Sequence, residues 1–186
     1  MANVPELQGR RVLVGVGGSV AAYKACDVVT ELRKSSADVR VAMSEAATRL
    51  VSPLLLRSLS GHRVAVSMFD DAEAEHGMPH IDLGLWCEVH AVVAASADLI
   101  ARLALGLAGD VITASALSSR APLLIAPAME TMMWEHPATQ ANVATLASRG
   151  VVFVGPVSGR LASGREGAGR MAEPADIVAA IATSLG

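Results

Sequence analysis

Five short apolar runs, rich in β-branched residues, alternate along this sequence with segments of helical length. The first two runs are residues 11–16 and 38–43, and residues 21–34 between them have the pattern of a helix. The other three runs are residues 90–95, 122–126 and 151–154. A strand that is followed by a helix and a second strand forms a parallel unit. The order therefore predicts an α/β fold, a Rossmann-like three-layer sandwich with a central parallel sheet.

The segments between and after the strands have the length and the apolar spacing of helices. Besides residues 21–34, these predicted helices cover residues 45–59, 99–107, 139–149 and 175–185. Pro53 splits or restarts the first of these four. A chain of 186 residues can bury about two thirds of its unfolded surface as one unit. We therefore expect a single domain over residues 1–186.

Hydrophobic residues make up 52% of the chain and charged residues only 18%. No apolar stretch reaches the length of about 18 residues that a membrane span needs, and residues 1–10 lack the apolar core of a signal peptide. We therefore expect no membrane partner but a cytoplasmic homo-oligomer that buries its apolar surplus between subunits. A net charge of −3 argues against a nucleic-acid partner. The isolated Cys26 and Cys87 argue against a metal site or a disulfide.

Glycine and hydroxyl side chains follow the first three strands at their carboxyl ends. Gly17-Gly18-Ser19 follows the first strand, Ser44 the second and Ser96 the third. In a parallel sheet these ends meet at one edge, where helix amino termini direct backbone N–H groups at an anion. The three hydroxyls predict a shared ligand site, although the dinucleotide fingerprint G-x-G-x-x-G is absent. The alternative is a set of tight turns in which each serine only caps a helix.

Two further segments are candidates for function. His80 lies in the segment Pro79-His-Ile-Asp-Leu83 and can act as a base or hydrogen-bond partner near neutral pH. The alternative for a lone histidine is a structural role. The glycine-rich segment 158–173 is longer than a typical connection. We expect it to form a mobile flap over the carboxyl edge of the sheet.

Taken together, motifs over roughly residues 10–175 resemble the homo-oligomeric flavin-containing cysteine decarboxylases. This family includes phosphopantothenoylcysteine decarboxylase and the peptidyl-cysteine decarboxylases of lantibiotic and related peptide biosynthesis. The segments that carry the resemblance are Gly17-Gly-Ser-Val-Ala-Ala-Tyr-Lys24, Pro79-His-Ile-Asp-Leu83, Ala94-Ala-Ser-Ala-Asp-Leu-Ile-Ala101, Pro127-Ala-Met-Glu-Thr-Met-Met-Trp134, Arg160-Leu-Ala-Ser-Gly164 and Gly169-Arg-Met-Ala-Glu-Pro174.

The resemblance implies an FMN cofactor and assigns roles to individual residues. FMN is expected to contact Gly18, Ser19, Val20, Ser44, Ala46, Ser96, Ala97, Asp98, Leu99 and Ala128. The substrate is expected to contact Met129, Glu130, Arg160, Ala162 and Ser163. The catalytic residues implied are His80, which would face the flavin and the substrate thiol, together with Glu130 and Ser163. The resemblance also implies homotrimers, and homododecamers built from them.

Two positions depart from the family pattern. Glu130 replaces an asparagine that is expected to hold the substrate carboxylate. Its charge would repel that group unless Glu130 is protonated, turned away or paired with Arg160, Arg165 or Arg170. Ser163 stands where enzymes of the pantothenate pathway have a proton-donating cysteine. A serine hydroxyl is a far weaker acid than a thiol, whose pKa is about 8.5.

Three hypotheses about function follow, and Ser163 decides their order. The first is FMN-dependent oxidative decarboxylation of a C-terminal peptide cysteine to an enethiol, in modified-peptide biosynthesis. The second is the phosphopantothenoylcysteine decarboxylase of coenzyme A biosynthesis, which the segments Arg160-Leu-Ala and Met171-Ala-Glu-Pro174 favour. The third is a non-catalytic flavin-binding regulatory scaffold. In both catalytic hypotheses the substrate is a peptide or a small molecule that ends in cysteine.

Overall fold

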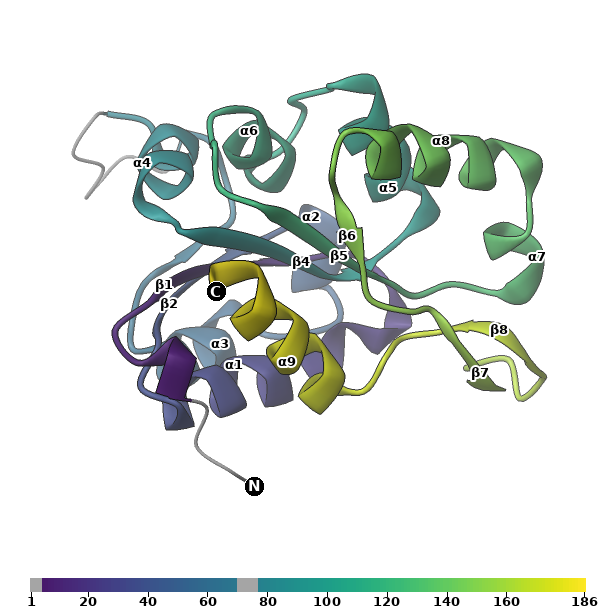
Figure 1. Cartoon of the computed structure of the whole chain (residues 1–186), viewed down its shortest axis with the longest axis horizontal. Helices are drawn as coiled ribbons and strands as arrows, with labels where there is room; N and C mark the ends of the chain where they lie inside the picture. The colour runs from purple at the N-terminus through teal and green to yellow at the C-terminus, as the bar shows by residue number, and fades with distance from the viewer. Residues whose placement is uncertain (1–4, 70–76) are drawn as a thin grey trace.

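A computed structural model describes residues 5–69 and 77–186, which form three layers around a parallel sheet (Figure 1). The sheet has six strands in the order β3-β2-β1-β4-β5-β6. Their bounds are β1 Arg11–Val16, β2 Asp38–Met43, β3 Val64–Ala65, β4 Val89–Ala95, β5 Leu123–Pro127 and β6 Val152–Phe153. The predicted Rossmann-like sandwich is confirmed. The first two predicted strands match β1 and β2 to the residue, whereas the two-residue strand β3 was not predicted.

Helices cover both faces of the sheet. The helical segments are η1 Pro5–Leu7, η2 Val20–Lys24, α1 Ala25–Lys34, α2 Glu45–Thr48, α3 Pro53–Ser60, α4 Pro79–Trp86, α5 Ala97–Leu105, α6 Val111–Leu117, α7 Thr131–Trp134, α8 Pro137–Ser148 and α9 Pro174–Leu185. Helices α1, α3 and α9 pack on one face, and α4, α5, α6 and α8 pack on the other (Figure 1).

Alternation along the strands divides the core into two clusters. Val12, Val14 and Val16 of β1 join the cluster under α1, α3 and α9, whereas Leu13 joins the cluster under α4, α5, α6 and α8. Successive side chains of a strand point to opposite faces of the sheet, so a strand buried on both faces is apolar throughout. This burial explains why the strands were visible in the sequence as continuous apolar runs.

Two predicted helices are divided in the structure. The segment 21–34 begins as the short 3-10 helix η2 and continues as α1, and the segment 45–59 is interrupted between α2 and α3. The second break has a local cause, because Ser52 caps α3 and Pro53 occupies its first turn. Proline favours this position because its missing N–H would have no partner there. Pro53 therefore marks the start of a second helix, which is one of the two outcomes expected from the sequence.

The glycine-rich segment 158–173 contains an antiparallel hairpin. Its strands are β7 Val157–Arg160 and β8 Glu166–Arg170. The hairpin extends away from the sheet on the side of α7, at the right of Figure 1. Within residues 5–69 and 77–186, none of the helices combines the length and apolar character needed to cross a bilayer.

Candidate active site

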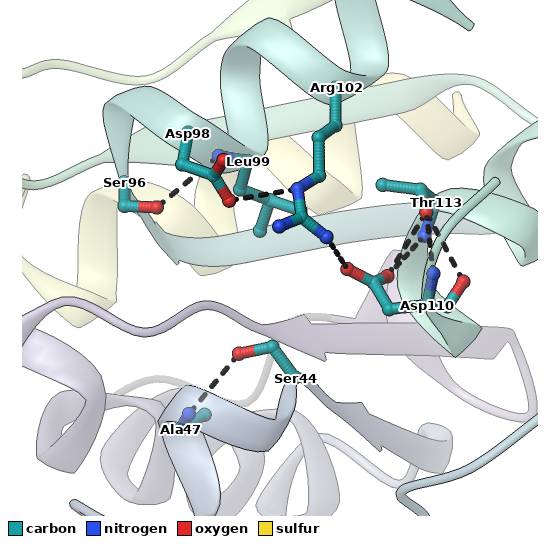
Figure 2. Close-up of polar contacts among 8 residues, drawn as sticks. All are labelled: Ser44, Ala47, Ser96, Asp98, Leu99, Arg102, Asp110 and Thr113. Atoms are coloured by element: carbon teal, nitrogen blue, oxygen red, sulfur yellow. Dashed lines mark hydrogen bonds and ion pairs between the residues drawn. The ribbon is translucent and has the colours of Figure 1, made fainter. Parts of the chain in front are cut away.

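Three serines mark the carboxyl edge of the sheet, as predicted. Ser19, Ser44 and Ser96 follow β1, β2 and β4, and each is the N-cap of the helical segment that follows. Figure 2 shows Ser44 at the start of α2 and Ser96 at the start of α5. The hydroxyl oxygens accept N–H hydrogen bonds over distances of 3.2–3.4 Å, from Ala21 for Ser19, Ala47 for Ser44 and Leu99 for Ser96. Capping leaves each hydroxyl hydrogen available to donate to a ligand.

Close packing explains the two glycines of the first turn. A Cβ atom on Gly17 would lie 2.4 Å from the carbonyl oxygen of Ala94, and one on Gly18 would lie 2.5 Å from Cβ of Ala46. Neither position can hold a side chain unless the backbone shifts. Gly18 also lines both cavities at this edge. At this turn, backbone atoms without a side chain therefore line the two cavities.

Two cavities meet at Gly18 and Ser96. The larger, which we call the α5 cavity, has a volume of about 930 Å³, and the other, the flap cavity, has about 560 Å³. Both volumes are in the range of small-molecule sites. Predicted flavin contacts line both: Gly18, Ser44, Ala46, Ser96, Asp98 and Leu99 in the α5 cavity, and Gly18, Ser19, Val20, Ser96 and Ala128 in the flap cavity. Ala97 lines neither cavity.

The donor set and the shape of this edge fit a flavin mononucleotide. Capping hydroxyls and the amino termini of α2 and α5 are suited to a phosphate, and the joined cavities leave space for a ring. A third cavity, of about 900 Å³, lies between α1 and α9 and contains none of the predicted flavin contacts. Ser19 lines the flap cavity, Ser44 lines the α5 cavity and Ser96 lines both, so a ligand shared by the three hydroxyls stays a prediction.

An ion-pair network borders the α5 cavity. The guanidinium of Arg102 lies 2.9 Å from the carboxylate of Asp98 and 3.7 Å from that of Asp110 (Figure 2). Asp110 in turn accepts the N–H of Thr113 at 2.9 Å and caps α6. Arg102 therefore offsets a negative charge at the amino terminus of α5, where a phosphate would otherwise be repelled. Our sequence reasoning missed Arg102, although the i,i+4 spacing from Asp98 was a usable signal.

Glu130 lines the flap cavity, as do Lys24, Arg160 and Arg170. Glu130 is the N-cap residue of α7, but its side chain makes no capping hydrogen bond. Arg170 pairs with Glu173, and Lys24 also lies 3.3 Å from Glu173. Over the described residues, no ion pair joins Glu130 to the three predicted partners Arg160, Arg165 and Arg170.

The hairpin packs directly on the segment that carries Glu130. The backbone N–H of Met129 donates to the carbonyl oxygen of Gly169 at 3.0 Å. A Cβ atom on Gly169 would lie 2.2 Å from the carbonyl oxygen of Met129, and one on Gly167 would lie 2.2 Å from Oγ1 of Thr131. Glycine is thus required where the hairpin meets α7. The predicted flap is docked on the site in this structure.

The tip of the hairpin divides the predicted substrate contacts. Met129, Glu130, Arg160 and Ala162 line the flap cavity. Ser163 is exposed and does not line it, and its hydroxyl accepts the N–H of Arg165 at 3.3 Å. The structure therefore does not bring Ser163 to the reacting space, and its catalytic role stays a prediction.

His80 lies apart from both cavities. Its carbonyl oxygen accepts a hydrogen bond from the hydroxyl of Ser118 at 2.8 Å, just after the end of α6. Asp110, at the opposite end of α6, lines the α5 cavity, so the two ends are separated by about 12 Å of helix. In Figure 1, α4 is at the left and the hairpin at the right. His80 lines neither the α5 cavity nor the flap cavity of its own chain, and its catalytic role stays a prediction.

Neither cysteine takes part in this site. Cys26 and Cys87 are both free, and burial raises the pKa of each thiol. The Cys87 thiol also lies 3.4 Å from the hydroxyl of Ser119. A raised pKa disfavours the reactive thiolate. Neither thiol is therefore favoured as a nucleophile, although Cys26 is only half-buried.

Comparisons with known proteins agree with this architecture. The Flavoprotein family model matches residues 2–186. The coenzyme A biosynthesis bifunctional protein CoaBC of Escherichia coli is 46% identical over 173 residues, which cover 93% of this chain and 42% of that protein. CoaBC of Mycobacterium tuberculosis is 47% identical over 168 residues, covering 90% of this chain and 40% of that protein. The chain thus spans less than half the length of these curated relatives.

Solved structures show the same similarity. The FMN-dependent cysteine decarboxylase SpaF has a TM-score of 0.82 and 32% identity, with 97% of each chain covered. A PPC decarboxylase mutant complexed with pantothenoylaminoethenethiol has a TM-score of 0.82 and 29% identity, with 94% of this chain and 97% of that chain covered. The predicted family, its FMN cofactor and its enzyme class are confirmed. This chain belongs to the flavoprotein family that contains the FMN-dependent cysteine decarboxylases.

Proposed function

We propose that this chain decarboxylates phosphopantothenoylcysteine with the help of FMN, as a step of coenzyme A biosynthesis. One observation carries the proposal: the chain is 42–47% identical to CoaBC proteins over at least 90% of its length. This observation favours the second hypothesis from the sequence over the first. Because the CoaBC proteins are more than twice as long, the proposal concerns the part of their activity that involves a cysteine decarboxylase.

The cofactor would lie along the α5 cavity and reach the flap cavity. Ser44 and Ser96 would donate hydrogen bonds to its phosphate or ribityl oxygens, and Gly18 would allow close approach of the backbone. Met129, which lines the flap cavity, would offer the ring an apolar contact. When bound, FMN accepts a hydride in the oxidation of the substrate thiol and returns it in the reduction of the enethiol.

The flap cavity would hold the cysteine end of the substrate. Its wall combines apolar atoms of Met129 and Ala162 with the cations Lys24 and Arg160. Cations suit a substrate that carries both a carboxylate and a phosphate. The docked hairpin would exclude water from the reacting atoms and hold the substrate against the ring.

His80 would come from a neighbouring subunit of a homo-oligomer. This part of the proposal is supported by the separation of His80 from the cavities of its own chain. Exposed leucines near His80 supply a reason for association: Leu85 of α4 is 63% exposed and Leu117 of α6 is 59% exposed. Their burial between subunits would be favourable, and it would also bring an imidazole to the substrate thiol as a proton acceptor.

The experiment compares two substrates on the FMN-bound protein. Incubation with phosphopantothenoylcysteine should give a product that has lost carbon dioxide only, detected by mass spectrometry. Incubation with a peptide that ends in cysteine should give no product. Loss of carbon dioxide and two hydrogens from the peptide, with no turnover of the small substrate, would overturn the proposal. Turnover of neither substrate would support the scaffold hypothesis instead.

A peptidyl-cysteine decarboxylase is the second candidate. Ser163 favours it, because serine cannot replace the proton-donating cysteine that the family resemblance places at this position. The 32% identity to SpaF over 97% of both chains is consistent with this candidate. It ranks second because the identity to the CoaBC proteins is higher and because Ser163 lies outside the flap cavity.

A further inference from the structure

Glu130 places a carboxylate in the cavity where the carboxylate of the substrate has to bind. The residue is half-buried and lines the flap cavity between η2 and the hairpin. The other charged groups that face this space are Lys24 from η2, Arg160 from β7 and Arg170 from β8. Two carboxylates held at short range cannot both stay ionised without a strong electrostatic penalty.

The nearby cations are largely committed to another carboxylate. Glu173 pairs with Arg170 through one carboxylate oxygen and with Lys24 through the other. Arg160 alone then has to serve the two carboxylates and the remaining charge of the substrate. The side chain of Lys24 is only 17% exposed, so its pairing with Glu173 is not a freely moving surface contact. Glu130 and the substrate carboxylate would therefore compete for Arg160, the cation of this cavity that makes no ion pair among the described residues.

The backbone at Glu130 is also fixed in place. The carbonyl oxygen of Gly169 in the hairpin accepts a hydrogen bond from the N–H of Met129. A side chain at Gly169 would collide with the carbonyl oxygen of Met129. The peptide between Met129 and Glu130 is thus enclosed by β8. Glu130 can rotate its side chain, but the chain cannot withdraw it from the cavity without undocking the hairpin.

From this arrangement we infer that Glu130 takes up one proton when the substrate binds and later delivers that proton to the substrate. The inference rests on the proposed function. Uptake removes the repulsion between the two carboxylates and lets them share a hydrogen bond, as paired carboxylates do. Departure of the substrate carboxylate as carbon dioxide removes this partner. The Glu130 proton is then free to move to the carbon atom that the carboxylate has left.

The proton balance of the proposed reaction matches this role. Breaking the bond from Cα to the carboxyl carbon releases carbon dioxide and leaves its electron pair in the enethiolate. In the reduction that follows, Cβ takes back the hydride from reduced FMN and Cα takes the proton of Glu130, which becomes a carboxylate. The net reaction replaces one carboxylate by one hydrogen and consumes one proton. That proton is the one taken up at binding.

This role also accounts for a decarboxylase that has Ser163 on the flap. Ser163 is exposed, and its oxygen accepts a hydrogen bond from the N–H of Arg165. Glu130 lies in the cavity and is a far stronger acid than a hydroxyl. Glu130 and Ser163, the two departures from the family pattern, thus have one explanation. The residue that donates the proton is Glu130 at the start of α7 and not the residue at the tip of the hairpin.

The first experiment measures proton uptake without turnover. The FMN-bound protein is titrated with the substrate analogue in which a hydroxyl replaces the thiol, using isothermal titration calorimetry in buffers of different ionisation enthalpy. Wild type should take up close to one proton at pH 8, and Glu130→Gln should take up none. The same analogue without its carboxylate separates this proton from protonation of the phosphate. Glu135→Gln, which changes an exposed carboxylate at the other end of α7, should match wild type.

The affinity for the analogue should depend on pH, because binding of the analogue is coupled to protonation of Glu130. Where Glu130 is ionised in the free protein, the dissociation constant of the carboxylate analogue should rise about tenfold per pH unit, and the dependence should vanish in Glu130→Gln. Absence of proton uptake by wild type, or equal uptake by Glu130→Gln, would refute the inference. If wild type still converts phosphopantothenoylcysteine in that case, the proposed function stands without it.

The second experiment identifies the product. With phosphopantothenoylcysteine, wild type should release the saturated thiol, whereas Glu130→Gln should accumulate the enethiol, which has two hydrogens fewer. Glu135→Gln should again give the saturated product. Release of the saturated thiol by Glu130→Gln at the rate of wild type would show that the proton has another source.

Discussion

Lowering the pH from 7 to 5 should destabilise this protein through one buried histidine, His90 of β4. Its side chain is 1% exposed, and neither ring nitrogen has a hydrogen-bond partner among the described residues. Gly15 makes room for the ring, because a Cβ atom there would lie 3.1 Å from Nε2 of His90. Burial lowers the pKa of His90 from 6.5 to about 4.

The size of the effect follows from the two pKa values. In the unfolded chain the imidazole takes up a proton as the pH falls through 6.5, whereas in the folded protein it stays neutral until about pH 4. The unfolded state therefore gains stability over this range. The loss of folding free energy should be about 2 kcal/mol at pH 5 and should approach about 3 kcal/mol below pH 4. Above about pH 7.5 the contribution is almost constant.

The assay compares wild type with His90→Leu, which has no titrating group at this position. Urea unfolding is followed by circular dichroism at pH 7, 6 and 5, at fixed protein and saturating FMN concentrations because both affect apparent stability. His62→Gln, at a histidine that is 40% exposed and lies 2.8 Å from the carboxylate of Asp38, measures the effect of removing a histidine outside the core together with its ion pair. Parallel losses of stability in wild type and His90→Leu between pH 7 and 5 would refute the reasoning.

Three substitutions test the site itself. Gly18→Ala should weaken FMN binding at least tenfold in a fluorescence titration, because its Cβ would lie 2.5 Å from Cβ of Ala46; unchanged affinity would contradict the close packing. Gly169→Ala should undock the hairpin from Met129, raising the KM for phosphopantothenoylcysteine at least tenfold with little change in FMN affinity. If Gly169→Ala changed the KM and the FMN affinity by the same factor, this result would argue against a separate flap cavity. Ser163→Ala should leave kcat and KM within about twofold of wild type, since Ser163 is exposed; a large drop in kcat would restore its predicted catalytic role.

The strands were predictable because burial on both faces leaves a direct trace in the sequence. Residues 11–16 and 38–43 are apolar runs that end at a glycine turn and at Ser44, and they match β1 and β2. The two-residue strand β3 was not predictable in this way, because it is too short to show any periodicity. Helix α6 begins at the capping box of Asp110 and Thr113, a local signal that we did not use.

The site was only partly predictable, for a physical reason. Ser19, Ser44 and Ser96 could be grouped because parallel strands bring their carboxyl ends to one edge, and the structure places all three there. His80 and Ser163 were assigned by motif, and their positions depend on helix and hairpin packing that no local pattern encodes. The pairing of Arg170 with Glu173 instead of Glu130 is likewise a tertiary contact.

Helix α6 separates His80 from the two cavities of its own chain, and this separation can be tested genetically. If the histidine of one chain completes the site of another, a variant without His80 and a variant without Glu130 are defective in different halves of each site. Mixed oligomers of the two contain some sites with both intact halves. Two inactive alleles expressed together would then restore part of the growth that neither supports alone.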